Sequence, residues 1–267
     1  MNGEKGKVCV TGASGFLASW LVKRLLLAGY HVIGTVRDPG NERKLAHLWK
    51  LEGAKERLQL VRAELLEEGS FDEAIIGCQG VFHTASPVMK PSFDPEASEK
   101  AAWEFCNENK IDLVTVLPTF VIGPCLPPDL CSTASDVLGL LKGETKQFQW
   151  HGRMGYVHID DVALCHILVY ENEAANGRYL CNSTVMDNNE LASFLSLRYP
   201  SLSVPKRFEE DGRPYYEFNT SKIKSLGFNF RPIEDMFDDC IESLVEQGHL
   251  PPLQRGHQRL RASPIAI

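Results

Sequence analysis

The stretch KVCVTGASGFLASWLVKRLLLAG, residues 7–29, decides the fold of this chain. Its pattern predicts an apolar strand, a glycine turn and an apolar helix. Gly12, Gly15 and Ala18 have the G-x-x-G-x-x-A spacing of loops that bind the pyrophosphate of a dinucleotide. Gly12 allows the tight turn, Gly15 lets backbone approach phosphate, and Ala18 lets the helix pack closely on the strand. A glycine turn without a ligand is the alternative, and the flanking strand and helix favour the dinucleotide site.

Outward from this stretch, the first half of the chain alternates strands with helices. This alternation predicts parallel βαβ units and a doubly wound α/β sheet, because parallel strands need long crossovers. The strands are nearly continuous runs of Val, Ile and Leu, which suits strands covered on both faces. The expected strands are 7–12, 30–36, 58–63, 80–85 and 111–118, and the expected helices are 15–29, 41–51, 70–75 and 98–110.

The second half has shorter and less regular elements. We expect helices at 132–142, 159–173, 188–200, 220–227 and 232–248, and a strand at 177–182. The pattern predicts a Rossmann-like NADP-binding domain at 5–123 and a smaller substrate-covering region at 124–250 with elements that return to the Rossmann fold. The Pro-bounded, basic and aperiodic tail 251–267 is expected to be disordered.

Composition excludes several classes of protein. The formal net charge of −7 argues against a nucleic-acid partner, since such proteins usually carry a basic face. The eight cysteines form no C-x-x-C pair and no metal-like spacing, which predicts reduced thiols in a cytoplasmic protein without a metal. The polar start MNGEKGK predicts no signal peptide, and no apolar run is long enough for a membrane span.

The end of the second strand indicates which dinucleotide binds. An NAD site usually places an acidic residue there for the ribose hydroxyls. This chain reads GTVRD, so that Arg37 stands at the strand end and Lys44 follows one or two helical turns beyond. The guanidinium of Arg37 can grip a 2′-phosphate, and Lys44 can add charge. Asp38 could serve a ribose instead, but the pair of cations favours NADP.

Two further strand ends point at the same ligand. Glu64 and Leu65 end the third strand, where a side chain can meet the adenine, and the segment HTASP at 83–87 ends the fourth. Within that segment, His83 is interpreted as a packed or backbone-bonded histidine rather than a catalyst. Farther on, the paired carboxylates of residues 160–161 precede an apolar helix and are interpreted as its N-cap and first-turn charges.

Several stretches together resemble a known family. The phosphate loop, HTASPV at 83–88 and GYVHIDDVA at 155–163 are similar to the plant dihydroflavonol reductase and cinnamoyl-CoA reductase group of extended short-chain dehydrogenases/reductases. LPPDLCSTASDVLGLLKGETKQFQWHGRM at 126–154 resembles the tetraketide α-pyrone reductase subfamily. The similarity covers about residues 5 to 250, with one break.

The resemblance implies an NADPH-dependent reduction of a ketone. The substrate it implies is a small polyketide, a tetraketide α-pyrone that feeds the pollen-wall polymer sporopollenin; a phenylpropanoid of the dihydroflavonol or cinnamoyl-CoA type is the alternative. It also implies association with related enzymes of the pathway. A third reading, a nucleotide-sugar epimerase or dehydratase, is opposed by Arg37 and Lys44, since those enzymes generally keep NAD.

The resemblance also assigns the cofactor contacts, although the family usually has Asp where this chain has Glu64. Pyrophosphate would lie on Gly12, Ala13, Ser14, Gly15, Phe16 and Leu17, the 2′-phosphate on Arg37 and Lys44, and adenine on Glu64 and Leu65. Thr84, Ala85 and Ser86 would line the ribose and nicotinamide, and Pro118, Thr119, Phe120 and Val121 would flank the carboxamide with Thr133 nearby.

The family's proton donor is missing. A Tyr gives the proton to the alkoxide, and a Lys four residues later on the same helix face lowers the pKa of that Tyr. None of the seven tyrosines in this chain has Lys four residues later, so the sequence predicts no catalytic residue. The resemblance implies that several dozen residues of the family, comprising a helix, the next strand with its Ser and the start of the Tyr-bearing helix, are absent near residues 95–98.

This loss leaves two interpretations of the chain: a splice form or incomplete form of a reductase, whose cofactor half has no catalyst, or a chain in which a different residue has taken over as proton donor. A rival of another class is a non-catalytic NADP-binding protein that pairs with full-length relatives. The loss also removes the strand between 80–85 and 111–118. Either the sheet closes over by one place, or it opens a seam of unpaired backbone, which is costly when buried. We therefore expect a chain less stable than its relatives.

Overall fold

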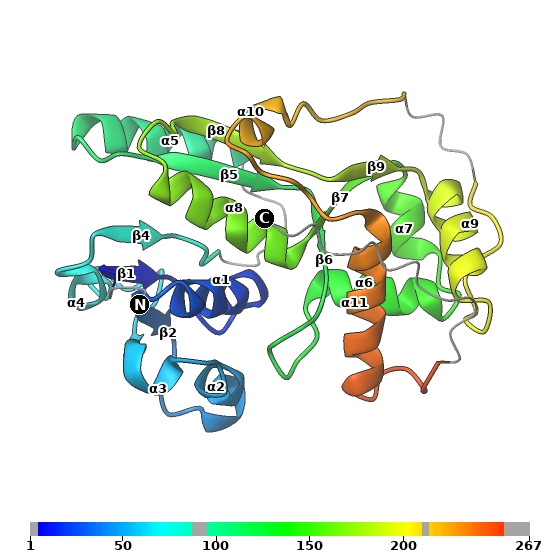
Figure 1. Ribbon diagram of the computed structural model, residues 1–267, viewed down its shortest axis with the longest axis horizontal. Coiled ribbons are helices and arrows are strands. Elements are labelled where there is room, and N and C mark those ends of the chain that lie inside the picture. The colour runs from blue at the N-terminus through cyan, green and yellow to red at the C-terminus, as the bar shows by residue number, and fades with distance from the viewer. Residues whose placement is uncertain (1–4, 87–94, 210–213, 254–267) are drawn as a thin grey trace, which may run out of the picture.

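The computed structural model describes residues 5–86, 95–209 and 214–253 (Figure 1). Its first half is a four-stranded parallel sheet in the order β3-β2-β1-β4, in which Val8 lies opposite Val32 on one side and Gly80 on the other. The α/β Rossmann-like fold class is confirmed. The elements are β1 (Lys7–Val10), α1 (Phe16–Leu27), β2 (His31–Val36), α2 (Glu42–Trp49), α3 (Ala54–Arg57), β3 (Leu58–Arg62), α4 (Asp72–Ile75) and β4 (Gly80–Phe82).

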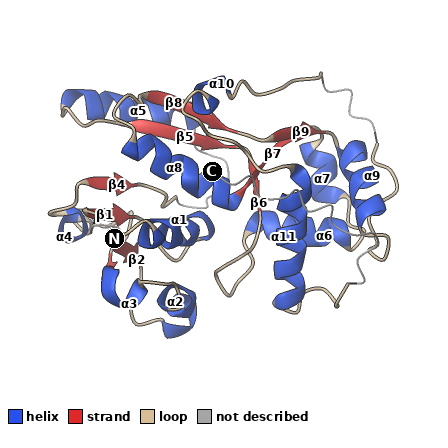
Figure 2. Ribbon diagram, in the orientation of Figure 1, coloured by secondary structure: helices blue, strands red, loops and turns tan. Residues whose placement is uncertain are grey.

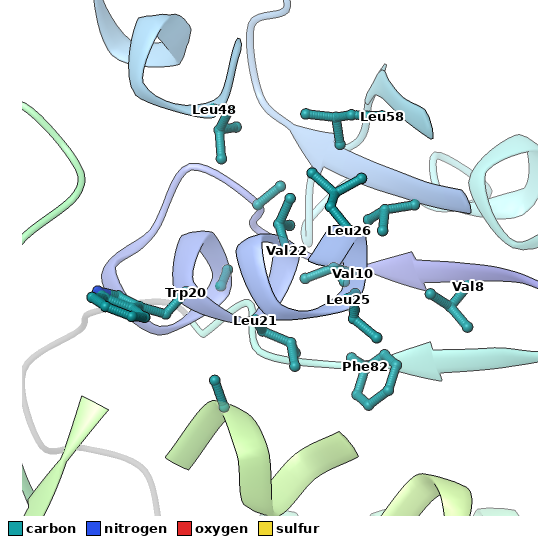
Figure 3. Close-up of a cluster of buried hydrophobic side chains, with 14 of the residues drawn as sticks. Val8, Val10, Trp20, Leu21, Val22, Leu25, Leu26, Leu48, Leu58 and Phe82 are labelled. Carbon is teal, nitrogen blue, oxygen red and sulfur yellow. The ribbon is translucent and has the colours of Figure 1, made fainter. Parts of the chain in front are cut away.

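Helix α1 anchors the first core. Its apolar side chains pack against the sheet, α2 and the helix α8 (Ile159–Glu171), with Leu21, Leu25 and Leu26 completely buried (Figure 3). Phe82 at the end of β4 joins the same cluster. Each such leucine contributes about 1.5–3 kcal/mol of hydrophobic free energy relative to the exposed side chain. The local pattern of residues 16–27 therefore fixes the helix against the strand that precedes it.

The second half contains two smaller sheets. One pairs β5 with β8 in parallel, and the other has the order β6-β7-β9, in which β9 is antiparallel. The helices α6, α7, α9 and α11 enclose a separate core with β6 and β7. The elements are α5 (Pro95–Glu108), β5 (Val114–Pro118), β6 (Phe120–Ile122), α6 (Ser132–Leu141), α7 (Lys146–His151), β7 (Met154–His158), α8 (Ile159–Glu171), β8 (Gly177–Cys181), β9 (Thr184–Met186), α9 (Asn188–Arg198), α10 (Ser221–Lys224) and α11 (Ile233–Glu246).

Helix α8 joins the two halves. It lies between α1 and the β5–β8 sheet (Figures 1 and 2). Ile159, Ala163 and Ile167 of α8 are buried in the α1 core, whereas Val162, Cys165 and Val169 are buried toward β8. The halves are therefore held together by helix packing on both faces of α8.

The strands β4 and β5 do not pair with each other. In the part of the chain that the structure describes, β4 pairs with β1 and β5 pairs with β8, and each ends its sheet. Val81 of β4 is 51% exposed, although an inner strand of a parallel sheet is normally buried on both faces. Of the two arrangements expected after the loss of a strand, the structure has the open seam.

Some elements differ from the sequence prediction. Helix α5 begins at Pro95 rather than at residue 98, and β5 begins at Val114 rather than at 111. The short strands β6, β7 and β9 and the helices α3 and α7 were not predicted, and the strand expected at 80–85 ends at Phe82. From residue 254 onward, the predicted tail lies outside the described residues. No helix among the described residues is long and apolar enough to cross a membrane.

Candidate cofactor-binding site

The glycine loop connects β1 to α1 in the conformation that the sequence predicts. Gly12 has φ of +69°, a left-handed conformation that side chains rarely adopt. Its N–H donates to Thr35 Oγ1 at 3.1 Å, and the next N–H, of Ala13, donates to Thr35 O at 2.8 Å. Ala13 is completely buried, and its N–H is engaged by Thr35, so the structure gives it a role in holding the loop on β2. The end of β2 thus holds the glycine loop through two hydrogen bonds to Thr35.

The N-terminus of α1 is open to an anion. Gly15 is its N-cap, and no side chain caps the helix there. The first turn, which contains Phe16 and Leu17, has no acidic residue. An uncapped helix N-terminus offers N–H groups and a positive dipole end, which is the usual setting for phosphate. Ser14 beside it is half-buried.

The segment after β4 lies directly on the glycine loop. Thr11 Oγ1 accepts hydrogen bonds from the N–H groups of Thr84 and Ala85, each at 3.0 Å. The Thr84 hydroxyl donates to Thr11 O at 2.8 Å. A Cβ on Gly12 would lie 3.2 Å from Ala85 Cβ, a tight contact that adds to the preference for glycine set by the positive φ. Ser86 follows at the exposed end of this segment.

Close packing of the loop on the sheet depends on small residues. Ala18 is 3% exposed on the face of α1 toward the strands. A Cβ on Gly34 of β2 would lie 2.8 Å from Ala13 Cβ, closer than such atoms approach in proteins. Any larger residue at these positions would lift the loop and α1 off the sheet.

The predicted 2′-phosphate contacts lie beyond the end of β2. Arg37 is exposed, and no hydrogen bond or ion pair within the described ranges engages its guanidinium. Asp38 Oδ1 accepts from the N–H of Gly40 at 2.9 Å and so closes a turn. Lys44 is exposed in the first turn of α2, where its N–H donates to the N-cap Asn41. The acidic residue is thus engaged, and the two cations face solvent.

The predicted adenine contacts follow β3. Glu64 is half-buried, and Ser70 bridges its backbone: Glu64 N–H donates to Ser70 Oγ at 3.0 Å, and that hydroxyl donates to Glu64 O at 2.8 Å. Leu65 is 42% exposed. An exposed leucine beside a rigid turn presents an apolar face of the kind that an adenine ring can cover.

The predicted contacts to the nicotinamide carboxamide lie on the other side of the seam, at the end of β5 and in β6. Pro118 ends β5, and Thr119 N–H donates to Cys181 O at 3.1 Å while its hydroxyl donates to Asn182 Oδ1 at 3.0 Å. The half-buried Phe120 ring packs on Phe148 and Tyr156 with centroids 5.9 and 5.8 Å apart.

Val121 and Leu17 connect the two sides of the seam, because both pack against the buried apolar cluster that α8 forms with β8. Thr133 lies in the first turn of α6, with its hydroxyl 3.4 Å from Cys131 Sγ. The structure therefore brings residues 12–17 and 84–85 into direct contact. Residues 118–121 reach the loop only through apolar packing.

Two residues that hold the loop were missed from the sequence. Thr11 and Thr35 make the hydrogen bonds that bind three strand ends together, and both are buried. A threonine immediately before Gly12 is visible in the sequence. Its role depends on β4 lying beside β1, and local sequence does not report such a long-range arrangement.

Tyrosine–lysine pairs in the structure do not replace the family's proton donor. Lys5 lies over the ring of Tyr30 and Lys222 over that of Tyr179, with the ammonium 5.0 and 4.2 Å from the ring centroids. These are cation–π contacts on the ring face. Burial raises the pKa of Tyr30, and the hydrogen bond that it donates to Glu171 raises it further. Proton transfer near neutral pH needs the opposite shift.

Tyr156 is buried on β7. Its ring is completely buried, and its hydroxyl has no hydrogen-bond partner among the described residues. Burial strongly raises the pKa of this phenol. His83, the remaining candidate, is exposed, and its Nδ1 lies 3.1 Å from Thr11 Oγ1; its partner is a side-chain hydroxyl, so the prediction of a packed or backbone-bonded histidine is wrong.

The paired carboxylates at the start of α8 have a structural role. The first-turn position is confirmed, but the predicted N-cap is wrong: His158 is the N-cap, and its Nδ1 accepts from Asp160 N–H at 3.0 Å. Asp160 binds Arg24 and Arg231, and Asp161 Oδ1 lies 2.8 Å from Arg231 Nη1. Both carboxylates need their arginines because they are buried.

Comparison with known proteins identifies the family to which this chain belongs. The chain is 58% identical to tetraketide alpha-pyrone reductase 1 of Arabidopsis thaliana, in an alignment that takes in 94% of this chain and 98% of the relative. The chain belongs to the dihydroflavonol reductase and cinnamoyl-CoA reductase family of oxidoreductases. This family lies within the extended short-chain dehydrogenases/reductases, in agreement with a match of residues 8–96 to the NAD dependent epimerase/dehydratase family.

Other members of the family are similar along most of their length. Cinnamoyl-CoA reductase CAD2 of Medicago truncatula is 38% identical, over 90% of this chain and 96% of the relative. Among solved structures, vestitone reductase from alfalfa has a TM-score of 0.79 at 31% identity, and the match covers 92% of this chain and 100% of that chain.

The alignments also reveal a size difference within the family. The alignment with the Arabidopsis reductase extends over 321 positions, more than the 267 residues of this chain. The relative therefore contains several dozen residues that have no counterpart here, as the resemblance implied. Their location near residues 95–98 stays a prediction.

Proposed function

We propose that this chain binds NADPH at the glycine loop but does not by itself complete the reductase reaction of its family. NADPH would lie with its pyrophosphate over Gly15 and the N-terminus of α1, and with its 2′-phosphate at Arg37 and Lys44. The observation on which this rests is the pairing of an intact phosphate loop with the absence of any Tyr-x-x-x-Lys pair.

The site suits a dinucleotide for reasons independent of the relatives. The helix N-terminus is uncapped, Gly12 and Gly34 leave the space that side chains would fill, and Asp38 is engaged in its own turn. Two exposed cations beyond β2 favour the phosphorylated cofactor. The remaining predicted contacts, from Glu64 to Thr133, would complete the cradle.

The residues of this chain can bind and orient but cannot protonate. When bound, NADPH supplies a hydride to a carbonyl carbon. The oxygen that results needs a proton from a positioned group with a pKa near neutrality. Of the tyrosines near lysine, neither presents its hydroxyl to the ammonium group, and burial raises the pKa of Tyr30 and of Tyr156. The chain therefore supports binding without turnover.

The ketone that the longer form would reduce is that of a tetraketide α-pyrone, in the synthesis of pollen-wall precursors. Support comes from 58% identity to a reductase of that name, against 38% to a cinnamoyl-CoA reductase. We place the protein in the cytoplasm, which agrees with eight free thiols, and expect it to associate with other enzymes of the same pathway.

The test separates binding from turnover. Purified chain is titrated with NADPH while cofactor fluorescence is followed, and NADPH consumption is then followed by absorbance with a tetraketide α-pyrone. We expect saturable binding and no consumption above the blank, with the Arabidopsis reductase as the active control. Turnover at a rate comparable with that control would overturn the non-catalytic part, and absence of binding by folded protein would overturn the cofactor part.

A further inference from the structure

Trp20 connects the phosphate-binding helix to the second half of the chain. It lies in the second turn of α1 and is 6% exposed, and Figure 3 shows its ring at the edge of the α1 core. The indole N–H donates to Pro124 O at 2.8 Å, and the ring meets that of His158 edge-on, with centroids 6.4 Å apart. Pro124 belongs to the segment that leaves β6, residues 123–125, which we call the β6 exit segment. Helix α1 thus offers its N-terminus to phosphate and also holds this segment.

The β6 exit segment is fixed by two further helices. Gly123 has φ of +145°, and a Cβ there would lie 2.5 Å from Ile159 Cγ2 of α8, so the backbone lies directly on that helix. The N–H of Cys125 donates to Ser243 Oγ of α11 at 3.1 Å. Together with the bond from Trp20, these contacts hold three consecutive residues against α1, α8 and α11.

The exit segment directly follows the predicted nicotinamide contacts. The backbone runs from Pro118, at the end of β5, through β6 into the exit segment. Ligands of open α/β sheets bind at the carboxyl ends of the strands. In the proposed function the nicotinamide lies along residues 118–121, so the exit segment determines where this stretch lies relative to α1.

The open seam makes side-chain contacts between the halves important. In the described part of the chain, β4 pairs with β1 and β5 with β8, so no strand ladder sets the distance from the glycine loop to residues 118–121. Leu17 and Val121 contribute apolar packing, which has no preferred direction. The hydrogen bond from Trp20 to Pro124 constrains both a distance and an angle.

We propose that Trp20 is a positioning residue for the cofactor: it holds the nicotinamide half of the NADPH site in place relative to the pyrophosphate half. This inference rests on the proposed function. Trp20 acts through Pro124, whose carbonyl loses its partner when the indole N–H is removed. The stretch that meets the nicotinamide must then be ordered when the cofactor binds, and ordering a segment on binding lowers affinity.

Two ligands separate the halves of the site. NADPH occupies both halves, whereas 2′-phospho-ADP-ribose has the 2′-phosphate and the pyrophosphate but no nicotinamide. Both are titrated calorimetrically into the full chain and into Trp20→Phe, which keeps an aromatic ring and removes the N–H. Trp103→Phe is the matched control, because the indole N–H of Trp103 donates to Glu99 within the same helix, α5, at 3.3 Å.

We expect Trp20→Phe to weaken NADPH binding about threefold to tenfold and to leave binding of 2′-phospho-ADP-ribose unchanged. Ser243→Ala, which loosens the exit segment from α11 and leaves α1 intact, should show the same difference between the two ligands. Trp103→Phe should change neither affinity. Circular dichroism of each variant shows that it is folded, and Ser243→Ala decides if Trp20→Phe does not fold.

The outcomes distinguish this inference from the proposed function. Equal losses for both ligands in Trp20→Phe, or no loss for either, would overturn the positioning role and leave the cofactor site standing. A folded wild-type chain that binds neither ligand would overturn the proposed function, and the role of Trp20 with it.

Discussion

At the scale of single residues, Arg37 is the sharpest test of cofactor choice. Its guanidinium faces solvent beyond β2, and a 2′-phosphate there would gain charge-assisted hydrogen bonds worth about 1.5–3 kcal/mol. We therefore expect Arg37→Ala to weaken NADPH binding about tenfold to a hundredfold and to leave NADH binding unchanged. Fluorescence titration with both cofactors measures this. The matched control is Arg43→Ala, which removes a nearby cation that pairs with Asp129 at 2.9 Å. Equal losses for NADPH and NADH would contradict the assignment.

The buried carboxylate of Asp160 should make the stability of the fold depend on pH. Burial alone would raise its pKa, but hydrogen bonds from Arg24 and Arg231 outweigh burial and hold the pKa below the ordinary 3.8. A carboxyl group with a lowered folded pKa stabilises the fold above its unfolded pKa, and this contribution is lost as pH falls through the folded value. Asp160→Asn should cost about 2 kcal/mol near pH 7 and less near pH 3, because the contribution begins to fall once the pH drops below the unfolded pKa.

Urea unfolding at the two pH values measures the difference. Asp129→Asn is the control, since its ion pair with Arg43 is exposed and should contribute less than about 1 kcal/mol. If Asp160→Asn lowers the free energy of unfolding equally at both pH values, the loss comes from packing of the asparagine and not from the missing charge.

At the scale of elements, the seam between β4 and β5 predicts a local weakness. Each strand has one neighbour among the described residues, so about half of its amides lack a ladder partner. We expect amides of β4 and β5 to exchange with deuterium faster than those of β1 and β2, which lie between two neighbours. Hydrogen exchange followed by mass spectrometry measures this. Equal protection in all four strands would mean that the seam is closed in solution.

The elements also show which parts of the fold local sequence can predict. The strands and helices around the glycine loop could be predicted, because continuous Val and Ile runs and a glycine turn are local signals. The strands β6 and β9 could not, because each has three residues and exists only through pairing with β7. Likewise the glycines of the site were visible, whereas the part played by Thr11 and Thr35 depends on which strand ends meet.

At the scale of the whole molecule, the two halves are joined by α8 and not by a continuous sheet. The hydrogen bonds and burial that an additional strand would provide are therefore missing from the core. We expect the purified chain to melt several degrees below the Arabidopsis reductase, since about 1 kcal/mol corresponds to roughly 2–4 °C in a domain of this size. Calorimetry of both proteins measures it. A single sharp transition at or above that of the relative would contradict this expectation.

The break itself can be tested at the level of the transcript. We expect amplification across the codons for Pro95 to Glu99 to yield a longer product that encodes Tyr-x-x-x-Lys, because the relatives contain several dozen residues without a counterpart here. Sequencing of the product gives the answer. If only the short message exists, the chain has no Tyr-x-x-x-Lys pair, and we expect NADPH binding without ketone reduction.

The open edges of β4 and β5 also affect self-association of the protein. A strand edge with unpaired N–H and C=O groups is a template on which another strand can grow, and the exposed Val81 adds an apolar surface beside it. Molecules of this chain should therefore attach to one another edge to edge, and turbidity of a concentrated solution should rise with time. The time for which the protein stays in solution should then shorten as its concentration rises. A chain that retained the missing strand should stay in solution at high concentration.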